Sequence, residues 1–209
     1  MATHYLDIPL RDADVVKLRL GDTVYFSGPA FTCRSHLQRY IFDENHVLPF
    51  DTGHQNVLIH VGPIVIRENE QWKLIAFAPT SSIRFEKWGP RSVKYWKLKA
   101  IIGKTTMGKA TAQIMKELKC IHATPQYIGP NLLQDSVHIK NVYLLEEMGS
   151  IEASWQLELE KLGPFIVDID CEGNNYFDDL DEVIAQNVQK VYADLNIPKD
   201  FEFTRLYGR

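Results

Sequence analysis

The stretch APTSSIR, residues 78–84, places three hydroxyl side chains and a cation directly after the apolar run Leu74 to Phe77. A second stretch, IIGKTTMGK at residues 101–109, repeats this arrangement with Lys104 as its first cation. An apolar run that ends in polar residues is typical of a buried strand that leads into a loop. Cations and hydroxyl groups at such an end suit an anionic substrate, because preformed cations offset the desolvation of carboxylates or phosphates. The two stretches therefore predict strand ends that share a site for an anion.

Other apolar runs along the chain predict the remaining strands. The expected strands are Thr23 to Ser27, Val57 to Val61, Leu74 to Phe77, Ala100 to Ile102, Val142 to Leu145, Trp155 to Leu159 and Phe165 to Ile169. Helical periodicity occurs in Arg34 to Phe42, Met107 to Leu118 and Leu180 to Leu195. Strands outnumber helices and do not alternate regularly with them, so we expect a mixed α/β fold, a mixed sheet with a few covering helices, rather than a doubly wound parallel sheet.

The length of the chain fits one domain with two short ends. It has 209 residues, 45% of them hydrophobic, which is enough for one sizeable core. We expect an N-terminal arm over residues 1–17, the domain over residues 18–196 and a C-terminal tail over residues 197–209, where Pro198 prevents the last helix from continuing.

Composition narrows the function classes. A formal net charge of −4 argues against a nucleic-acid surface, because phosphate binding normally requires an excess of basic residues. No apolar span approaches membrane length, and the first residues do not have the pattern of a secretory signal. Cys33, Cys120 and Cys171 are far apart and odd in number, which favours buried free thiols in a reducing cytoplasm over disulfides or a metal site.

Two candidate site segments each allow a structural interpretation as well. Thr80 follows Pro79 and stands one helical turn before Arg84, so it is either a hydroxyl base beside a carboxylate-binding guanidinium or a helix cap near a surface arginine. Arg34 lies at the start of a predicted helix, where the helix dipole disfavours a cation. Its position indicates either an anion site or a salt bridge within the fold.

The segment Gly103 to Lys109 is close to the phosphate-loop pattern of nucleotide-binding proteins. The position that should supply a magnesium-binding hydroxyl is Ala110, so the last element of the pattern is missing. Nucleotide binding through this segment remains an alternative function.

Several motifs in order resemble those of the β subunit, or C-terminal domain, of the class I fumarate hydratase and L-tartrate dehydratase family. The matching stretches are LGDTVYFSG at 20–28, HVGP at 60–63, PTSSIR at 79–84, IGK at 102–104 and MGSIEASW at 148–155. The resemblance implies a swivelling β/β/α domain. It also implies an iron-sulfur α subunit as partner in a hetero-oligomer, with the 4Fe-4S cluster held by that subunit, the active site shared between the two chains, and no metal ligands in this chain.

Carried over from the family, Arg34, Arg84 and Lys104 match its carboxylate-binding cations, Thr80 matches its proposed catalytic base, and Ser81 takes the place of a second threonine. Catalysis is therefore expected from Thr80 and Lys104, and substrate binding from Arg34, Ser81, Arg84 and Lys104. The resemblance implies a cytoplasmic hydro-lyase subunit that dehydrates a hydroxy-dicarboxylate, malate to fumarate first and tartrate to oxaloacetate second. A noncatalytic binding or assembly subunit is the other alternative.

The sequence departs from the family pattern beside Arg34. The family usually has Asp directly after the matching arginine and His slightly later, where this chain has Ser35 and Gln38. These departures leave the substrate open.

Overall fold

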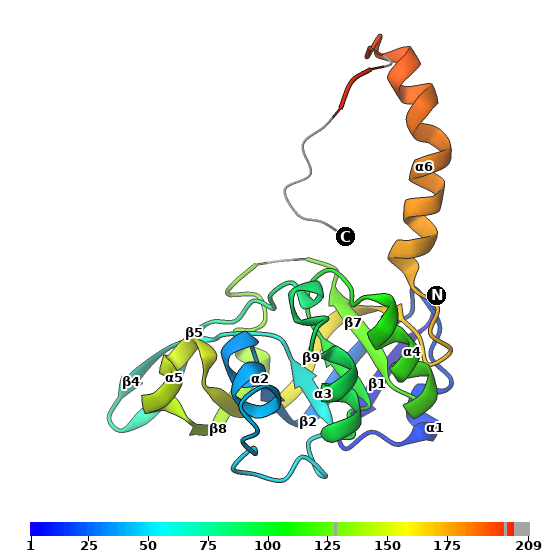
Figure 1. Cartoon of the computed structure of the whole chain (residues 1–209). Coiled ribbons are helices and arrows are strands. Elements are labelled where there is room, and N and C mark those ends of the chain that lie inside the picture. Colours follow the sequence, from blue (N-terminus) through cyan, green and yellow to red (C-terminus); the bar gives the residue numbers. More distant parts are fainter. Residues whose placement is uncertain (128, 199, 203–209) are drawn as a thin grey trace. The chain divides into compact units, whose positions relative to one another are not determined.

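A computed structural model describes residues 1–127, 129–198 and 200–202 of the chain (Figure 1). The chain divides into two units, Met1–Asn175 and Tyr176–Arg209. The expected tail, residues 197–209, falls partly outside the described residues.

The first unit contains all the strands of the described chain. They are β1 (Thr3–Asp7), β2 (Thr23–Thr32), β3 (Val57–Ile59), β4 (Ile64–Glu68), β5 (Gln71–Ala76), β6 (Ala100–Ile102), β7 (Ile121–Pro125), β8 (Val137–Tyr143) and β9 (Ser154–Ile169). Its α-helices are α1 (Asp12–Val15), α2 (Ser35–Phe42), α3 (Gly89–Tyr95), α4 (Lys109–Leu118) and α5 (Leu145–Glu152), and its short 3-10 helices are η1 (Ser82–Phe85) and η2 (Gln134–Ser136).

The main sheet is mixed and closes on itself. Its strand order is β1-β2-β3-β6-β7-β9-β8, with parallel pairing from β1 to β7 and antiparallel pairing of β9 with both β7 and β8. β9 also pairs antiparallel with β2, so hydrogen bonding runs around β2, β3, β6, β7 and β9 and back to β2. β4 and β5 form a separate two-stranded ribbon. The predicted mixed α/β fold is confirmed.

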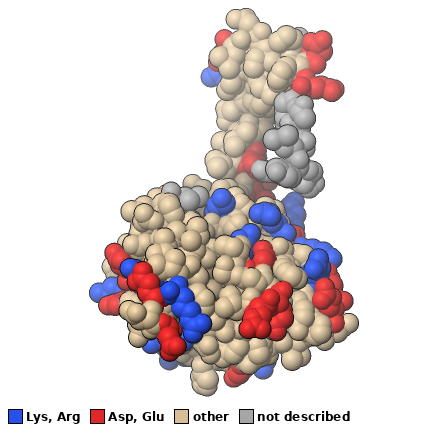
Figure 2. Space-filling view, turned by 90° about the vertical axis from the view of Figure 1, so that its left-hand side faces the viewer, with Lys and Arg blue, Asp and Glu red and all other residues tan. Residues whose placement is uncertain are grey.

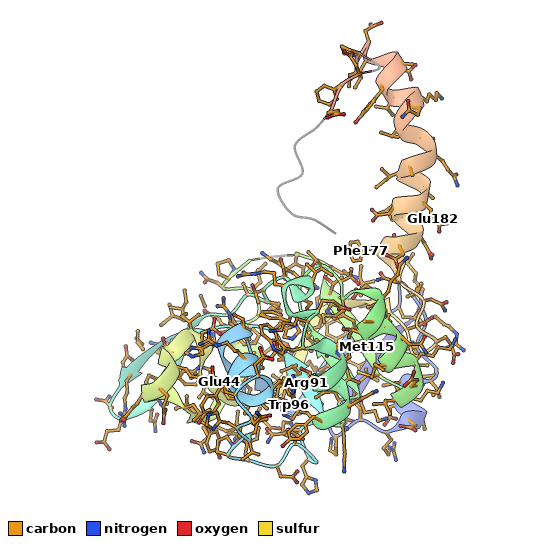
Figure 3. All side chains as sticks on the ribbon, viewed as in Figure 1. Glu44, Arg91, Trp96, Met115, Phe177 and Glu182 are labelled. Carbon is orange, nitrogen blue, oxygen red and sulfur yellow. The ribbon has the colours of Figure 1, made fainter. Side chains whose placement is uncertain are left out.

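Successive residues of the central strands face opposite sides, as strand geometry requires. Val57, Ile59, Ala100 and Ile102 belong to one apolar cluster, whereas Leu58 and Ile101 belong to a second. The first cluster fills the ring of strands, with side chains from β2, β7 and β9. The second lies between the sheet and helices α2, α3 and α4 (Figures 1 and 3). Trp96 and Met115, labelled in Figure 3, are buried in this second cluster.

Several strands differ from the sequence-based expectations. The expected strands 155–159 and 165–169 are parts of one strand, β9, because the intervening segment still pairs with β2 through Leu162, although the register shifts there and Lys161 has a left-handed backbone. The expected strand 142–145 ends at Tyr143, and Leu145 begins α5. Within residues 1–17, expected to form an arm, β1 pairs in parallel with β2.

Some short elements were not predicted from the sequence. These are β1, β4, β7, α1, α3 and α5. Most of them are too short to show a clear periodicity, and β7 interrupts its apolar residues with His122 and Thr124. Ala100–Ile102 was predicted with the bounds that β6 has, and a helix was predicted over most of α2 and α4.

The second unit contains α6, Tyr176–Asp194, which confirms the helix predicted to begin near Leu180. Acidic residues occupy its first turn, as the helix dipole favours, and Phe177 and Glu182 in this part are labelled in Figure 3. None of the described helices, α6 included, is both long and apolar enough to span a bilayer.

Candidate functional site

Backbone hydrogen bonds bring the two opening stretches of the sequence together. The amide of Lys104 donates to the Thr80 carbonyl at 3.0 Å, and the amide of Ser82 donates to the Lys104 carbonyl at 2.9 Å. Ser81 and Lys104 form an isolated parallel bridge. The amide of Thr80 donates to the His60 carbonyl at 2.7 Å. The hydroxyl-bearing loop therefore lies between the chain that leaves β3 and the chain that leaves β6, at the carboxyl ends of two parallel strands, where α/β sheets commonly bind ligands.

Arg34 reaches the same edge of the sheet from β2. A Cβ built on Gly62 would lie 2.7 Å from Arg34 Nη1, so the guanidinium passes close over the backbone two residues beyond His60. Glycine is required here chiefly because the same Cβ would lie 2.6 Å from the backbone carbonyl oxygen of Ile151. Arg34 thus reaches the segment whose His60 carbonyl is hydrogen-bonded to Thr80.

The charge of Arg34 is balanced inside the chain by Glu152. Arg34 Nε lies 3.3 Å from Glu152 Oε1, and the other carboxylate oxygen accepts from the His36 amide at 2.8 Å in the first turn of α2. Glu152 therefore offsets the unfavourable position of Arg34, which is the N-cap residue of α2. The salt bridge considered from the sequence is present.

Arg84 and Lys104 differ from Arg34 because no described residue forms an ion pair with either side chain. Arg84 is exposed in η1, and Lys104 is half-buried. Cations without a carboxylate partner leave their charge available to an anionic ligand. Figure 2 shows acidic and basic side chains interspersed on one face of the molecule, with no continuous basic area there.

Behind the hydroxyl-bearing loop lies a chain of four buried polar side chains, which we term the buried serine network: His60, Ser82, His122 and Asp168. Ser82 Oγ lies 2.9 Å from His60 Nδ1 and 2.8 Å from His122 Nε2, and His122 Nδ1 lies 2.6 Å from Asp168 Oδ1. All four residues are fully buried. Sequence reasoning missed this network, because its members occupy four separate segments and form no local motif.

The directions of these hydrogen bonds follow from the chemistry of the groups. A carboxylate only accepts, so His122 donates from Nδ1 to Asp168, and in a neutral ring its Nε2 then accepts from the Ser82 hydroxyl. Ser82 Oγ in turn accepts from His60 Nδ1. Burial, and next the neighbouring His122, hold the pKa of His60 well below its usual range, so that ring stays neutral. His60 Nε2 and Asp168 Oδ2, at the two ends of the network, have no hydrogen-bond partner among the described residues.

The order Ser82, His122, Asp168 is that of a serine hydrolase triad, but the geometry does not suit nucleophilic attack. Ser82 is fully buried, and a Cβ built on Gly103 would overlap its hydroxyl oxygen. A nucleophile must reach a bound carbonyl group, whereas this hydroxyl is enclosed by protein. The network is therefore an internal structure beneath the candidate site.

The segment that resembles a phosphate loop is already bound to an internal carboxylate. Glu86 accepts from the Gly108 amide at 2.7 Å, from the Thr111 amide at 3.1 Å and from the Thr111 hydroxyl at 2.7 Å. These amides at the start of α4 are the groups that would hold a phosphate. The geometry thus opposes the nucleotide-binding alternative.

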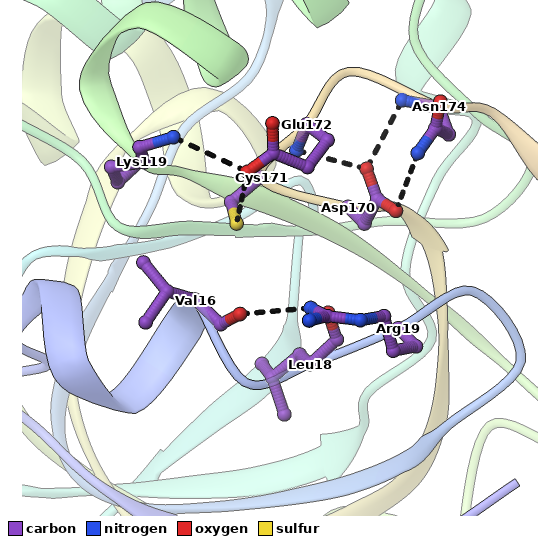
Figure 4. Close-up of polar contacts among 8 residues, drawn as sticks. All are labelled: Val16, Leu18, Arg19, Lys119, Asp170, Cys171, Glu172 and Asn174. Atoms are coloured by element: carbon purple, nitrogen blue, oxygen red, sulfur yellow. Dashed lines mark hydrogen bonds and ion pairs between the residues drawn. The ribbon is translucent and has the colours of Figure 1, made fainter.

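The described residues do not offer ligands for an iron-sulfur cluster. They contain no group of three or more His, Cys, Asp or Glu side chains that could hold a metal ion. The three cysteines are buried, and burial raises the pKa of each thiol, whereas cluster iron is bound by thiolates. Cys171 lies in a turn organised by Asp170, whose carboxylate accepts from the Glu172 and Asn174 amides and from the Asn174 side chain (Figure 4).

Hollows elsewhere on the described surface are lined by other residues. One of about 430 Å³ lies between the end of α2 and α3, and one of about 600 Å³ lies between the β4–β5 ribbon and the start of β8. Neither is lined by Arg34, Thr80, Ser81, Arg84 or Lys104. The candidate site residues thus lie outside both hollows.

Comparisons with known proteins agree on one family. The family model described as Fumarase C-terminus matches residues 3–180. The chain is 32% identical to a Methanocaldococcus jannaschii protein named provisionally as L(+)-tartrate dehydratase subunit beta, over 90% of this chain and 94% of that protein. It is 28% identical to the L(+)-tartrate dehydratase subunit beta of Escherichia coli, over 92% of each chain. A Geobacillus stearothermophilus protein named provisionally as a class I fumarate hydratase is 30% identical over 90% of this chain, which spans 37% of that protein.

Proposed function

The chain belongs to the fumarase C-terminus family, and on that premise we propose that it is the β subunit of a hydro-lyase that reversibly removes water from a hydroxy-dicarboxylate. Its active site would be shared with an α subunit that holds a 4Fe-4S cluster. The observation that carries the proposal is the backbone pairing of Thr80 and Ser81 with Lys104, which joins two hydroxyl-bearing residues to a lysine that has no ion pair with any described residue.

The proposed binding roles follow from the charges at the site. A C4 dicarboxylate carries two negative charges, and Arg84 and Lys104 are the site cations that no described carboxylate neutralises. The Ser81 hydroxyl, between Thr80 and the network residue Ser82, can donate a further hydrogen bond to substrate. Arg34 shares its charge with Glu152, so we assign it to orienting a carboxylate at the edge of the site.

In the proposed chemistry, Thr80 accepts the proton that is removed from the substrate. Dehydration removes a proton from the carbon beside one carboxylate and a hydroxyl group from the neighbouring carbon. Removal of that proton adds negative charge to the substrate, and a nearby ammonium group such as that of Lys104 lowers the energy of this charge. The same ammonium group favours a deprotonated hydroxyl at Thr80, which a proton acceptor requires.

Two observations support a partner. The candidate site lies at a strand-end edge, outside the hollow between α2 and α3 and the hollow beside the β4–β5 ribbon. The relatives that this chain matches over nearly their whole length are named as β subunits, whereas it matches only 37% of the provisionally named fumarate hydratase. A separate chain that completes the site and supplies the cluster accounts for both observations.

The substrate order remains part of the proposal. We propose the conversion of malate to fumarate as the first choice and that of L-tartrate to oxaloacetate as the second. The names of two relatives favour the second reaction. Malate and tartrate differ by one hydroxyl group. Sequence identities of 28–32% support the reaction class more strongly than the choice between these two substrates.

The test is reconstitution with the iron-sulfur subunit. The isolated chain should be colourless, hold no stoichiometric iron and show no dehydratase activity, because its described residues lack cluster ligands. The two-chain complex should be brown and should turn over malate, fumarate or L-tartrate in a direct comparison. Stoichiometric iron with turnover in the isolated chain would refute the need for a partner, and a well-assembled, cluster-loaded complex that converts none of these acids would support the noncatalytic alternative.

A further inference from the structure

The buried serine network is joined directly to the two residues proposed to carry the reaction. The Ser82 amide donates to the Lys104 carbonyl at 2.9 Å, and the His60 carbonyl accepts from the Thr80 amide at 2.7 Å. Two network residues therefore contact Thr80 and Lys104 through the backbone, while the Ser82 hydroxyl joins the same two residues to His122.

The other end of the network lies in the rigid sheet. His122 belongs to β7 and Asp168 to β9, and these strands pair with each other through His122 and Ile169. Immediately after β9, Asp170 fixes the chain in a turn through hydrogen bonds from Glu172 and Asn174 (Figure 4). The network thus ties a loop to two strands whose positions are set by the sheet.

Polar side chains are a costly way to fill this space. Four buried polar groups lose their hydration, and the two end atoms, His60 Nε2 and Asp168 Oδ2, gain no hydrogen bond from any described residue in return. Apolar side chains would fill the same volume at lower cost. Hydrogen bonds, however, have fixed directions, and they can hold a loop in one orientation where apolar contacts permit several.

We propose that the buried serine network positions Thr80 and Lys104 for reaction, with Ser82 as the positioning residue at its centre; the catalytic part of this inference rests on the proposed function. Gly103 is also needed for the buried serine network, because only a residue without Cβ leaves space for the Ser82 hydroxyl. No network side chain touches substrate. The network acts by fixing the backbone on which the site residues are carried.

The test is a double-mutant cycle at Gly103 and Ser82. Gly103→Ala would push the hydroxyl out of place, whereas in the double variant Gly103→Ala with Ser82→Ala the new methyl group takes the space of the missing oxygen. The next neighbours of that methyl group, the Thr80 carbonyl oxygen at 3.2 Å and His60 Cβ at 3.3 Å, need to move only slightly. The double variant thus restores the packing around position 103 without restoring the hydrogen bonds of Ser82.

Turnover in the reconstituted complex gives the first measurement. Ser82→Ala should lower kcat about tenfold or more with a smaller change in KM, because small displacements of reacting groups slow chemistry strongly. The double variant should recover most of the thermal midpoint lost in Gly103→Ala but none of the turnover. If the double variant turns over within about twofold of the wild type, packing is sufficient and the proposal is wrong.

Amide hydrogen exchange in the isolated full chain gives a second measurement that needs no activity. Ser82→Ala should speed exchange at the Thr80 and Lys104 amides about tenfold, because local opening becomes easier when buried hydrogen bonds are lost. Ser92→Ala is the matched control, since Ser92 is equally buried and its hydroxyl accepts from the side-chain amide of Gln38 at 3.2 Å. It should lower the thermal midpoint without changing exchange at Thr80 or Lys104.

The two measurements separate the two proposals. Unchanged exchange at both amides in Ser82→Ala would overturn the positioning role, whatever the activity. A wild-type complex with no dehydratase activity, together with the faster exchange, would refute the proposed function and leave the positioning of Thr80 and Lys104 supported.

Discussion

Replacing Lys104 by methionine should separate substrate binding from folding. The side chain of Lys104 is half-buried and has no ion pair with any described residue, so removing its charge breaks no salt bridge within the described chain. Both hydrogen bonds that hold its position, to the Thr80 carbonyl and from the Ser82 amide, are made by its backbone. Lys104→Met keeps both bonds and keeps most of the apolar length of the side chain.

The expected magnitudes follow from this geometry. The free energy of unfolding of the isolated chain should change by no more than about 0.5 kcal/mol, as for substitutions that break no buried interaction. The complex should lose about 2 to 5 kcal/mol of transition-state stabilisation, the scale for leaving a buried carboxylate without its partner. That loss lowers kcat/KM by roughly 30-fold to several thousandfold.

Urea unfolding of the isolated chain and steady-state kinetics of the complex provide the two measurements. Lys109→Met is the matched control, because this exposed lysine begins α4 only five positions away and should leave kcat/KM unchanged. Arg34→Met is the contrasting variant. It leaves Glu152, only 21% exposed, without its cation and should cost about 1 to 3 kcal/mol of stability. Near-wild-type kcat/KM in Lys104→Met would remove this residue from the site, and a large loss of stability would show that it has a structural role.

Three further changes test other parts of the structure. Thr80→Val should lower kcat about 100-fold or more with little change in stability if the hydroxyl is the proton acceptor, because the N-cap residue of η1 is Ser81 and not Thr80. A loss of about 1 kcal/mol of stability with normal turnover would give the Thr80 hydroxyl a structural role instead; Thr80→Ser should retain either role. Glu86→Gln should destabilise the chain by about 1 to 3 kcal/mol, because an amide group would then face the N–H donors of Gly108 and Thr111. The control Glu117→Gln, on the exposed face of α4, should have no such effect. Equal urea midpoints for the two variants would refute the role of Glu86 in capping the start of α4. Because the pKa of His60 is lowered, the unfolded chain binds a proton below pH about 6.5 that the folded chain does not. The free energy of unfolding should therefore fall by about 1.4 kcal/mol for each pH unit from there down to the folded pKa. Urea unfolding at several pH values should show a weaker pH dependence of this free energy in His60→Gln, and an identical pH dependence would contradict the assignment.

Local patterns were sufficient for much of the fold. The three-residue strand Ala100–Ile102 was predicted with its observed bounds, because apolar residues between polar segments have few other solutions. Helical periodicity was sufficient for most of α2, α4 and α6. The pairing of the Thr80 loop with Lys104 was also predictable as a juxtaposition, since each segment follows a buried apolar run and shows hydroxyl groups and cations in sequence.

The remaining features of the fold, which are the strand order and the extent of β9, depend on pairing between distant segments. Trp155–Leu159 and Phe165–Ile169 are predicted from the sequence as two strands, but both pair with β2 and so form one strand, β9. This pairing with β2 also closes the sheet into a ring. No periodicity within a segment specifies which strand will lie beside it.

The sequence by itself determined that hydroxyl groups and cations follow buried strands, because that is a property of neighbouring residues. Only the tertiary structure decided that Glu152 neutralises Arg34 and that Glu86 occupies the start of α4. It also decided that Ser82, an ordinary serine in a polar loop, lies between His60 and His122, since 22 and 40 positions separate it from these partners. Hydrogen bonds across such separations depend on strand order and register, and these are set by the packing of the whole chain.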